Sequence, residues 1–439
     1  MRKGMVVLFL VTALFIPTVA GAADDSARKE LEMLRHRIEQ LEKRLNAGER
    51  ERAEIKEKND EISAANKELK KIRETFGRLS LGGGITGIVQ GTVNNDGNAP
   101  EFGEVTDGSY SVDLEVEADL DKWGTAFIHL EAGDGDNVTD EIGALTGVNA
   151  DALGPQNDLE VAEAWWEFSP FGIKPLTITL GKLDPTAYWD ANEAANDETA
   201  QFLADMFVNS IAVEWPDYTP GIRIAVAPGD TLSFSVGVLS GDSDWEDVSE
   251  DVFAIAEIGF KAKFGGLEGN YRFYGWINGV DHLEWRDVAL GKTRSHKDNR
   301  GFGLSFDQNV SADVTLFCRF GWQDGDIAGV SYAPGGVLDP IAVEYTWSVG
   351  GQVTGARWNR PDDVIGLAVG QALLSDDFED MQQAAGVDPE DEFHLELYYS
   401  IFLNDYVAVS PDFQLIDNMG GDDDADTVYV FGIRCQLSF

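Results

Sequence analysis

The stretch that decides the fold is Tyr429-Val430-Phe431-Gly432-Ile433-Arg434-Cys435-Gln436-Leu437-Ser438-Phe439, at the end of the chain. Every second residue from Tyr429 to Phe439 is apolar, and the residues between them include Arg434, Gln436 and Ser438. A repeat of two gives a β-strand one apolar face and one more polar face. The same alternation runs through residues 112–120 and 393–403. This part of the chain is therefore predicted to be all-β.

Strand length and loop asymmetry distinguish a membrane barrel from a soluble β-sandwich, which also alternates. The predicted strands run about ten to thirteen residues, which suits a tilted membrane strand better than the usual five or six. Short turns such as 121–122, 265–266 and 404–405 alternate with long acidic connections such as 133–157 and 184–219. Short turns on one side and long loops on the other are typical of outer-membrane barrels. We expect residues 77–439 to form such a barrel.

The number of strands follows from parity, because single-chain bacterial barrels have an even number. Counting every alternating segment gives an odd total when the run Phe207 to Trp215 is included. Keeping all long loops on the outer side assigns that run to the long third loop, so we expect sixteen antiparallel strands. A barrel of this size leaves an aqueous channel.

The N-terminal residues carry a different signal. Arg2 and Lys3 precede an apolar run from Val6 to Ile16, and Ala20-Gly21-Ala22 follows as a small-x-small cleavage pattern. Residues 1–22 are therefore predicted to be a secretory signal peptide. We expect the mature chain to reside in the outer membrane.

Residues 23–76 are predicted to form an α-helical coiled coil. Leu31, Ile38 and Leu45 occupy one heptad core position, and Leu34, Leu41, Ile55, Ile62, Leu69 and Phe76 occupy the other. The first position later carries Arg52, Asn59, Asn66 and Arg73, polar groups that lower stability but fix register and strand number. The pattern leaves open a dimer, a trimer and a single solvated helix. At about 1.5 Å per residue, the heptad region would reach roughly 70 Å as a periplasmic stalk.

Charge excludes several partners. The chain has 33 Lys+Arg against 78 Asp+Glu, a formal charge of -45, and residues 77–439 hold 17 of the basic and 64 of the acidic residues. A field of this sign repels nucleic acid and attracts cations. The five histidines are scattered, and no nucleophile motif lies beside them. We expect no enzyme activity, no cofactor, no metal site and no nucleic-acid partner.

Lumen-facing positions follow from the alternation and supply the candidate solute contacts. Sugars offer an apolar face for Trp or Tyr and hydroxyl groups for charged side chains. Inward phase and this chemistry select Glu115, Glu117, Glu163, Trp165, Arg223, Arg272, Trp276, Arg319 and Arg434. His129 and Glu131 are also predicted to face inward. The third loop adds Trp189, from the cluster Tyr188-Trp189-Asp190.

Two blocks of the chain carry distinctive series of short motifs. The first contains Gly181-Lys182-Leu183-Asp184, Asn196-Asp197-Glu198, Gln201-Phe202-Leu203 and Phe207-Val208-Asn209. The second contains Glu396, Tyr398-Tyr399, Pro411 to Ile416 and Gly432-Ile433-Arg434. In these motifs and their order, the chain resembles the carbohydrate-selective porins of the OprB family, and the resemblance covers residues 77–439. It implies a sixteen-stranded channel with inward-folded loops, small sugars as preferred solutes, and Lys182 and Asp184 at the mouth of the third loop.

Three functions remain open on the sequence alone. The resemblance favours a passive porin for small hydrophilic solutes, with carbohydrates preferred. The acidic barrel favours a general cation-selective porin. The helix, which resembles periplasmic stalks that tether the outer membrane to the cell wall, favours a structural role. We expect contacts with outer-membrane lipid and lipopolysaccharide in each case, and the heptads leave a homo-oligomer and a cell-wall contact open.

Overall fold

The computed structural model describes residues 24–95, 103–136, 138–152, 158–246, 248–293, 295–333, 336–338 and 340–439. The predicted signal peptide, residues 1–22, lies outside these ranges. The chain divides into two compact units, Met1–Gly77 and Arg78–Phe439.

The first unit contains one long helix, α1, from Asp24 to Phe76. Its heptad residues Leu31, Leu34, Ile38 and Leu41 are 55–58% exposed in the single chain. The helix predicted for residues 23–76 is present over Asp24–Phe76, and its association into a coiled coil stays a prediction. No helix in the described part of the chain is long and apolar enough to cross a bilayer.

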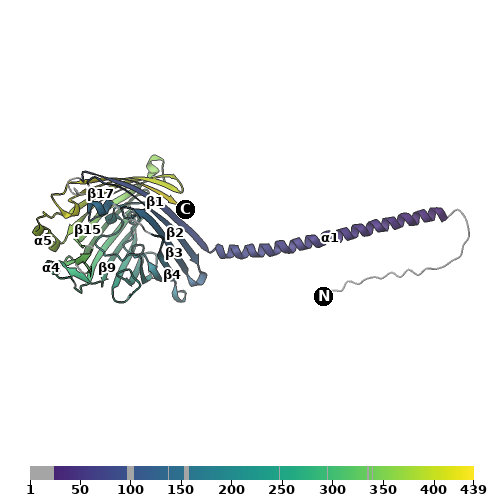
Figure 1. The fold of residues 1–439 in the computed structure, drawn as a ribbon, viewed down its shortest axis with the longest axis horizontal. Coiled ribbons are helices and arrows are strands. Elements are labelled where there is room, and N and C mark those ends of the chain that lie inside the picture. The colour runs from purple at the N-terminus through teal and green to yellow at the C-terminus, as the bar shows by residue number, and fades with distance from the viewer. Residues whose placement is uncertain are drawn as a thin grey trace. The chain divides into compact units, whose positions relative to one another are not determined.

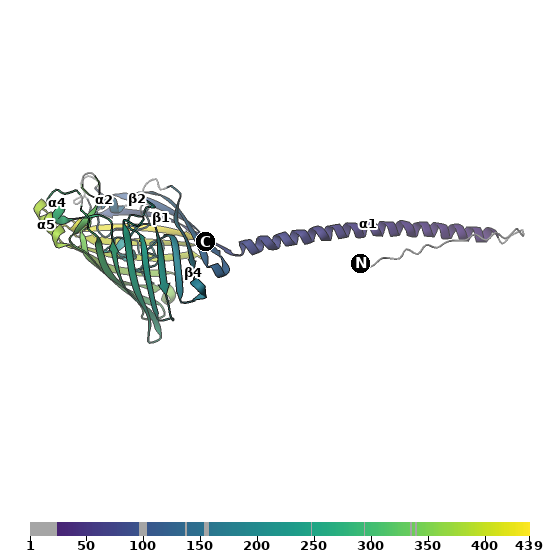
Figure 2. The same cartoon turned by 90° about the horizontal axis from the view of Figure 1, so that it is seen from below.

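The second unit is a closed antiparallel barrel (Figures 1 and 2). Its described residues form sixteen barrel strands in the order β1-β19-β18-β17-β16-β15-β12-β11-β9-β8-β7-β6-β5-β4-β3-β2. The strands are β1 (Leu79–Val93), β2 (Thr106–Asp119), β3 (Thr125–Gly135), β4 (Glu160–Phe168), β5 (Leu176–Leu183), β6 (Thr219–Val226), β7 (Leu232–Ser240), β8 (Val252–Phe264), β9 (Leu267–Asn278), β11 (Asn299–Asn309), β12 (Val314–Gln323), β15 (Val343–Thr354), β16 (Val364–Leu374), β17 (Glu392–Asn404), β18 (Val407–Asp417) and β19 (Val428–Ser438). The sixteen-stranded prediction is confirmed.

Alternation sets the two faces of each strand. In β19, Phe431 and Ile433 are 54% and 52% exposed on the outer face, whereas Val430 and Arg434 are 0% and 1% exposed inside. The last strand pairs with the first, and Cys435 lies opposite Gly87. The closing strand therefore leaves no free sheet edge for aggregation.

Long connections gather at one end of the barrel. They include the helices α2 (Val138–Ile142), α4 (Trp285–Ala289) and α5 (Asp376–Ala385) and a small sheet of β10 (His282–Glu284), β13 (Ile327–Ala333) and β14 (Gly336–Leu338). Figure 2 shows α2, α4 and α5 at that end. Short 3-10 turns occupy Asp121–Trp123, Pro170–Gly172, Gly355–Trp358 and Met419–Gly421.

The connection between β5 and β6, residues 184–218, is the third loop and is called L3 below. It contains α3 (Asp205–Val208). The Phe207 to Trp215 run is not a barrel strand, as parity predicted. Its apolar residues instead face the inner wall of the barrel.

Candidate functional site

L3 enters the lumen because its apolar side chains find a complementary wall there. Phe202, Met206 and Phe207 pack against the inward-facing Phe317 and Tyr398. A second cluster places Trp189 and Val213 of L3 against residues of β7, β8 and β9. The wall is recessed to admit them: a Cβ at Gly237 would lie 2.3 Å from the Trp189 ring. Burial of each such side chain contributes about 1.5–3 kcal/mol to holding the loop.

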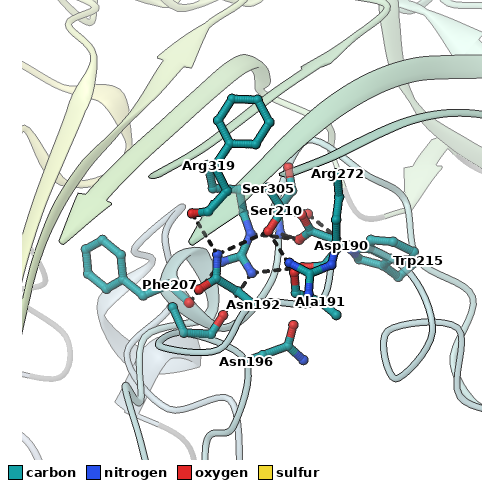
Figure 3. A network of polar contacts seen from close by, with 12 residues as sticks. Asp190, Ala191, Asn192, Asn196, Phe207, Ser210, Trp215, Arg272, Ser305 and Arg319 are labelled. Atoms are coloured by element: carbon teal, nitrogen blue, oxygen red, sulfur yellow. Dashed lines mark hydrogen bonds and ion pairs between the residues drawn. The ribbon is translucent and has the colours of Figure 1, made fainter. Parts of the chain in front are cut away.

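Arg319 of β12 is the central polar anchor of L3 (Figure 3). Its guanidinium donates to the carbonyls of Asp190 (3.1 Å), Ala195 (2.8 Å) and Phe207 (3.0 Å). Arg319 Nε also pairs with Asp190 Oδ2 at 2.9 Å, and that carboxylate accepts from the Ser210 amide. One side chain therefore ties together three separated points of the loop.

Two further lumen residues hold the tip of L3. Arg434 of β19 donates to the carbonyls of Glu198 (2.6 Å) and Gln201 (2.9 Å). Glu396 of β17 accepts from the amides of Leu203 (2.7 Å) and Ala204 (2.9 Å). Charge-assisted bonds of this kind are shorter and stronger than neutral ones. L3 is thus held by polar side chains from three barrel strands, β12, β17 and β19.

The second loop, whose described parts are residues 136, 138–152 and 158–159, also folds inward. Gln90 and Gln414 both donate to the Val148 carbonyl, at 2.8 and 2.9 Å. The Ala150 amide donates to the Leu203 carbonyl of L3 at 2.8 Å. The two loops therefore brace each other inside the channel.

The loops leave an acidic pocket of about 420 Å³ beside the β1–β3 wall. Its ionisable lining residues come from the wall, the second loop and L3, and they are Asp113, Glu115, His129, Glu131, Asp151, Asp197, Glu198 and Tyr218. Six of the eight are carboxylic acids. Burial raises the pKa of Asp151 to about 7 and that of Glu198 to about 8. The pocket can hold cations and can accept hydrogen bonds from solute hydroxyls.

A second pocket of about 320 Å³ lies on the other side of the L3 tip. It is lined by Arg272 together with L3 residues that include Glu193, Asn196 and Gln201. Arg272 Nη1 pairs with Asp307 Oδ2 at 2.8 Å. This side of the channel therefore mixes amides, a guanidinium and carboxylates.

Aromatic and charged side chains of β3, β4, β6 and L3 form a row that is called the ladder below. Its members are Phe127, Trp165, Glu167, Tyr188 and Arg223. Arg223 lies 4.6 Å above the centre of the Tyr188 ring and 3.6 Å from the Glu167 carboxylate. Trp165 stacks on Phe127 with ring centres 4.9 Å apart. Rings set among charged groups offer both the apolar face and the hydrogen-bonding partners that sugars use.

The structure brings several predicted residues together. Glu163 Oε2 accepts from the Trp165 indole and from the Asp184 amide, each at 3.1 Å. Lys182 donates to the Val161 carbonyl and lies 5.7 Å from the Tyr218 ring centre. Glu115 lines the acidic pocket, and Glu117 is exposed two residues further along β2.

Four predicted solute contacts need correction. The side chains of Trp276, Arg319 and Arg434 lie beneath L3, and Trp189 packs from the underside of L3 against the wall. These residues are only 0–5% exposed. They offer no surface to a passing solute, because the apolar and carbonyl groups of L3 cover them. We reassign them as residues that hold L3 or lie beneath it.

Of the eight ionisable residues of the acidic pocket, the predicted solute contacts included only Glu115 and omitted Asp113, His129, Glu131, Asp151, Asp197, Glu198 and Tyr218. The inward phase of β3 already placed His129 and Glu131 in the lumen. Asp151 and Glu198 lie in loops, and no periodic signal shows that a loop turns inward. A family motif, Asn196-Asp197-Glu198, is the sequence signal that could have identified Glu198.

Comparison with known proteins identifies the family. The family model described as "Carbohydrate-selective porin, OprB family" matches residues 104–439. An uncharacterized protein of Aquifex aeolicus is 25% identical over 267 residues, which cover 61% of this chain and 66% of that protein. Porin B of Pseudomonas aeruginosa is 34% identical over 94 residues, covering 18% of this chain and 21% of Porin B. The alignments thus span less than two thirds of each relative.

Solved structures support the fold. The high-pH structure of Pseudomonas putida OprB superposes with a TM-score of 0.70 at 19% identity, covering 83% of this chain and 96% of that one. The low-pH structure of the same protein gives a TM-score of 0.52 at 16% identity, covering 83% and 94%. Together with the family match over most of the barrel, these findings show that the chain belongs to the carbohydrate-selective porin, OprB family.

Proposed function

We propose that this barrel is a passive channel for small hydrophilic solutes, with mono- or oligosaccharides as the preferred class. The observation that carries the proposal is the position of L3, which is anchored by Arg319, Arg434 and Glu396 and leaves polar pockets at its tip. A fixed loop filters by size. The carboxylates and the Tyr188–Arg223 ladder supply weak contacts that permit release.

Similarity to Porin B and to the OprB structures supports a porin role for this chain. The family and the fold point to a channel rather than an enzyme, and we propose that the chain has no catalytic activity. We further propose that outer-membrane lipid and lipopolysaccharide surround the barrel, and that α1 extends into the periplasm.

A second function, general cation passage, is favoured by the six carboxylic acids of the acidic pocket. Single-channel conductance of the refolded protein in a planar bilayer separates the two. We expect glucose or maltose at millimolar concentration to reduce the ion current. Strong cation selectivity without any sugar block would support the general porin instead.

A third function, envelope tethering, rests on the exposed heptad residues of α1. Deleting residues 24–76 tests it. Envelope detachment with normal sugar permeability would support tethering, whereas lost uptake with an intact envelope would support a role for the helix in transport.

A further inference from the structure

Three lumen-facing side chains on β2 and β3 converge on one point of the acidic pocket. Asp113 lies directly opposite Glu131 in the antiparallel register, and Glu115 lies opposite His129. Ligand-type atoms of Asp113, His129 and Glu131 all lie within 4.8 Å of one another. His129 Nε2 is 2.8 Å from Asp113 Oδ1. The strand register brings Asp113 to this point, because it lies 16 and 18 positions before His129 and Glu131 in the chain.

The arrangement is unfavourable without a positive charge between the carboxylates. Like charges directly opposite each other destabilise a strand pair. His129 can offset part of this repulsion through its contact with Asp113. The Glu131 carboxylate is stabilised less, because the Tyr218 hydroxyl that donates to its Oε1 lies 3.5 Å away.

Glu131 also has an unpartnered oxygen. The residue is only 7% exposed, and its Oε2 has no hydrogen-bond partner among the described residues. A buried carboxylate oxygen without a partner costs free energy that a bound cation would recover. The atom without a partner, Glu131 Oε2, thus belongs to one of the three side chains of the Asp113, His129 and Glu131 cluster.

The donor set selects the kind of cation. One imidazole nitrogen with two carboxylates suits zinc and similar divalent transition metals, whereas magnesium and calcium prefer oxygen ligands throughout. Three protein ligands leave a coordination position for water. The adjoining cavity of about 420 Å³ has room for that water and provides an entry path.

We propose that Asp113, His129 and Glu131 form a binding site for a divalent transition metal of the zinc class in the channel wall. The site goes beyond the proposed sugar-channel function. A bound ion would add positive charge beside Asp197 and Glu198 of the L3 tip, which line the same pocket. Cation conductance should therefore fall when the metal binds.

The test uses full-length refolded protein that has been stripped with a chelator. Zinc chloride is titrated by calorimetry, and the same salt is added during single-channel recording. We expect one zinc per barrel with a reduced current, and an affinity at least about tenfold weaker in His129→Gln and in Glu131→Gln. Magnesium chloride at equal concentration should not reproduce the binding.

The matched control is His296→Gln. His296 also pairs with a carboxylate, Asp281 Oδ1 at 2.6 Å, but it is exposed, and no third ligand-type residue completes that pair in the described part of the chain. Zinc affinity should be unchanged in this variant. Glu131→Gln removes a charge from a crowded pair, so it should fold, and heat-modifiable migration on gels verifies this.

Two results would overturn the proposal. Equal zinc affinity in wild type and in correctly folded Glu131→Gln would place the metal elsewhere, and equal responses to zinc and magnesium would indicate general screening of acidic charge. Sugar block measured in chelator tests the channel function separately, so the failure of one proposal is distinguishable from the failure of the other.

Discussion

At the scale of single residues, Arg319 is predicted to control the width of the channel. It makes three hydrogen bonds to L3 carbonyls and an ion pair with the buried Asp190. Arg319→Ala removes all four contacts and leaves the buried Asp190 carboxylate without its charged partner. Breaking a buried pair in this way costs about 3–5 kcal/mol, which we expect to appear as release of L3.

The expected result for Arg319→Ala is a larger single-channel conductance and passage of larger sugars, measured in planar bilayers and by liposome swelling. Arg300→Ala is the control, since Arg300 is exposed and its ion pair is with Asp324, at 3.3 Å, away from L3. Unchanged conductance and size limit in Arg319→Ala would show that apolar packing alone holds L3.

The raised pKa values of two loop carboxyl groups, those of Asp151 and Glu198, predict that the ion selectivity of the channel depends on pH. Burial raises the pKa of Asp151 to about 7 and that of Glu198 to about 8, although Arg434 opposes the rise at Asp151, and Asp113 and Glu131 add to it. Both groups are largely neutral at about pH 6 and charged at about pH 9. The ratio of cation to anion permeability should therefore increase over this range.

The same shifts affect the stability of the inward loops. The folded loops bind protons that the unfolded chain releases at its ordinary carboxyl pKa. Their stabilisation is therefore complete below that ordinary pKa and is lost as pH rises through about 7 to 8.

Reversal potentials under a salt gradient measure how the cation selectivity changes with pH. In the double variant Asp151→Asn, Glu198→Gln, the ratio of cation to anion permeability should change less with pH than in wild type. If it changes as much as in wild type, these two groups do not cause the pH dependence.

At the scale of elements, the strands could be predicted from the sequence, but the contacts between the inward loops and the barrel wall could not. Period-two patterns such as residues 429–439 persist over the full length of a strand, so they identify both the strand and its faces. Trp189 and Trp276 show what that signal lacks. Their chemistry suited a sugar, but whether L3 covers them depends on packing between distant segments.

The α1 helix carries its own prediction. Ile62 is a heptad core residue that is 58% exposed in the single chain, so association with further copies would bury it. Each buried Ile contributes about 1.5–3 kcal/mol. We expect Ile62→Glu to reduce the oligomeric state of the full-length protein, measured by cross-linking and by sedimentation in detergent.

Ala64→Glu is the matched control for that change. Ala64 lies two residues along the same helix, on the face away from the heptad core, and receives the same charge. The oligomeric state should survive this substitution. If both variants behave like wild type, α1 acts as a single solvated helix.

At the scale of the whole molecule, charge and sugar recognition can be separated by salt. Residues 77–439 carry 64 acidic and 17 basic residues, so their net field favours cations. Salt shortens the reach of that field, from about 10 Å at 0.1 M to about 3 Å at 1 M. We expect cation selectivity to be strong at the lower concentration and to weaken at the higher one, as read from reversal potentials.

Sugar block should respond differently, because stacking on rings and hydrogen bonding to fixed carboxylates are short-range contacts that salt screens little. Maltose should therefore reduce the current by a similar fraction at both salt concentrations. Arg223→Ala should weaken this block, since Arg223 holds the Tyr188 ring at 4.6 Å, while leaving the salt dependence of selectivity in place. A block that disappears together with selectivity at high salt would mean that the acidic field, rather than a carbohydrate-binding surface, governs what this barrel passes.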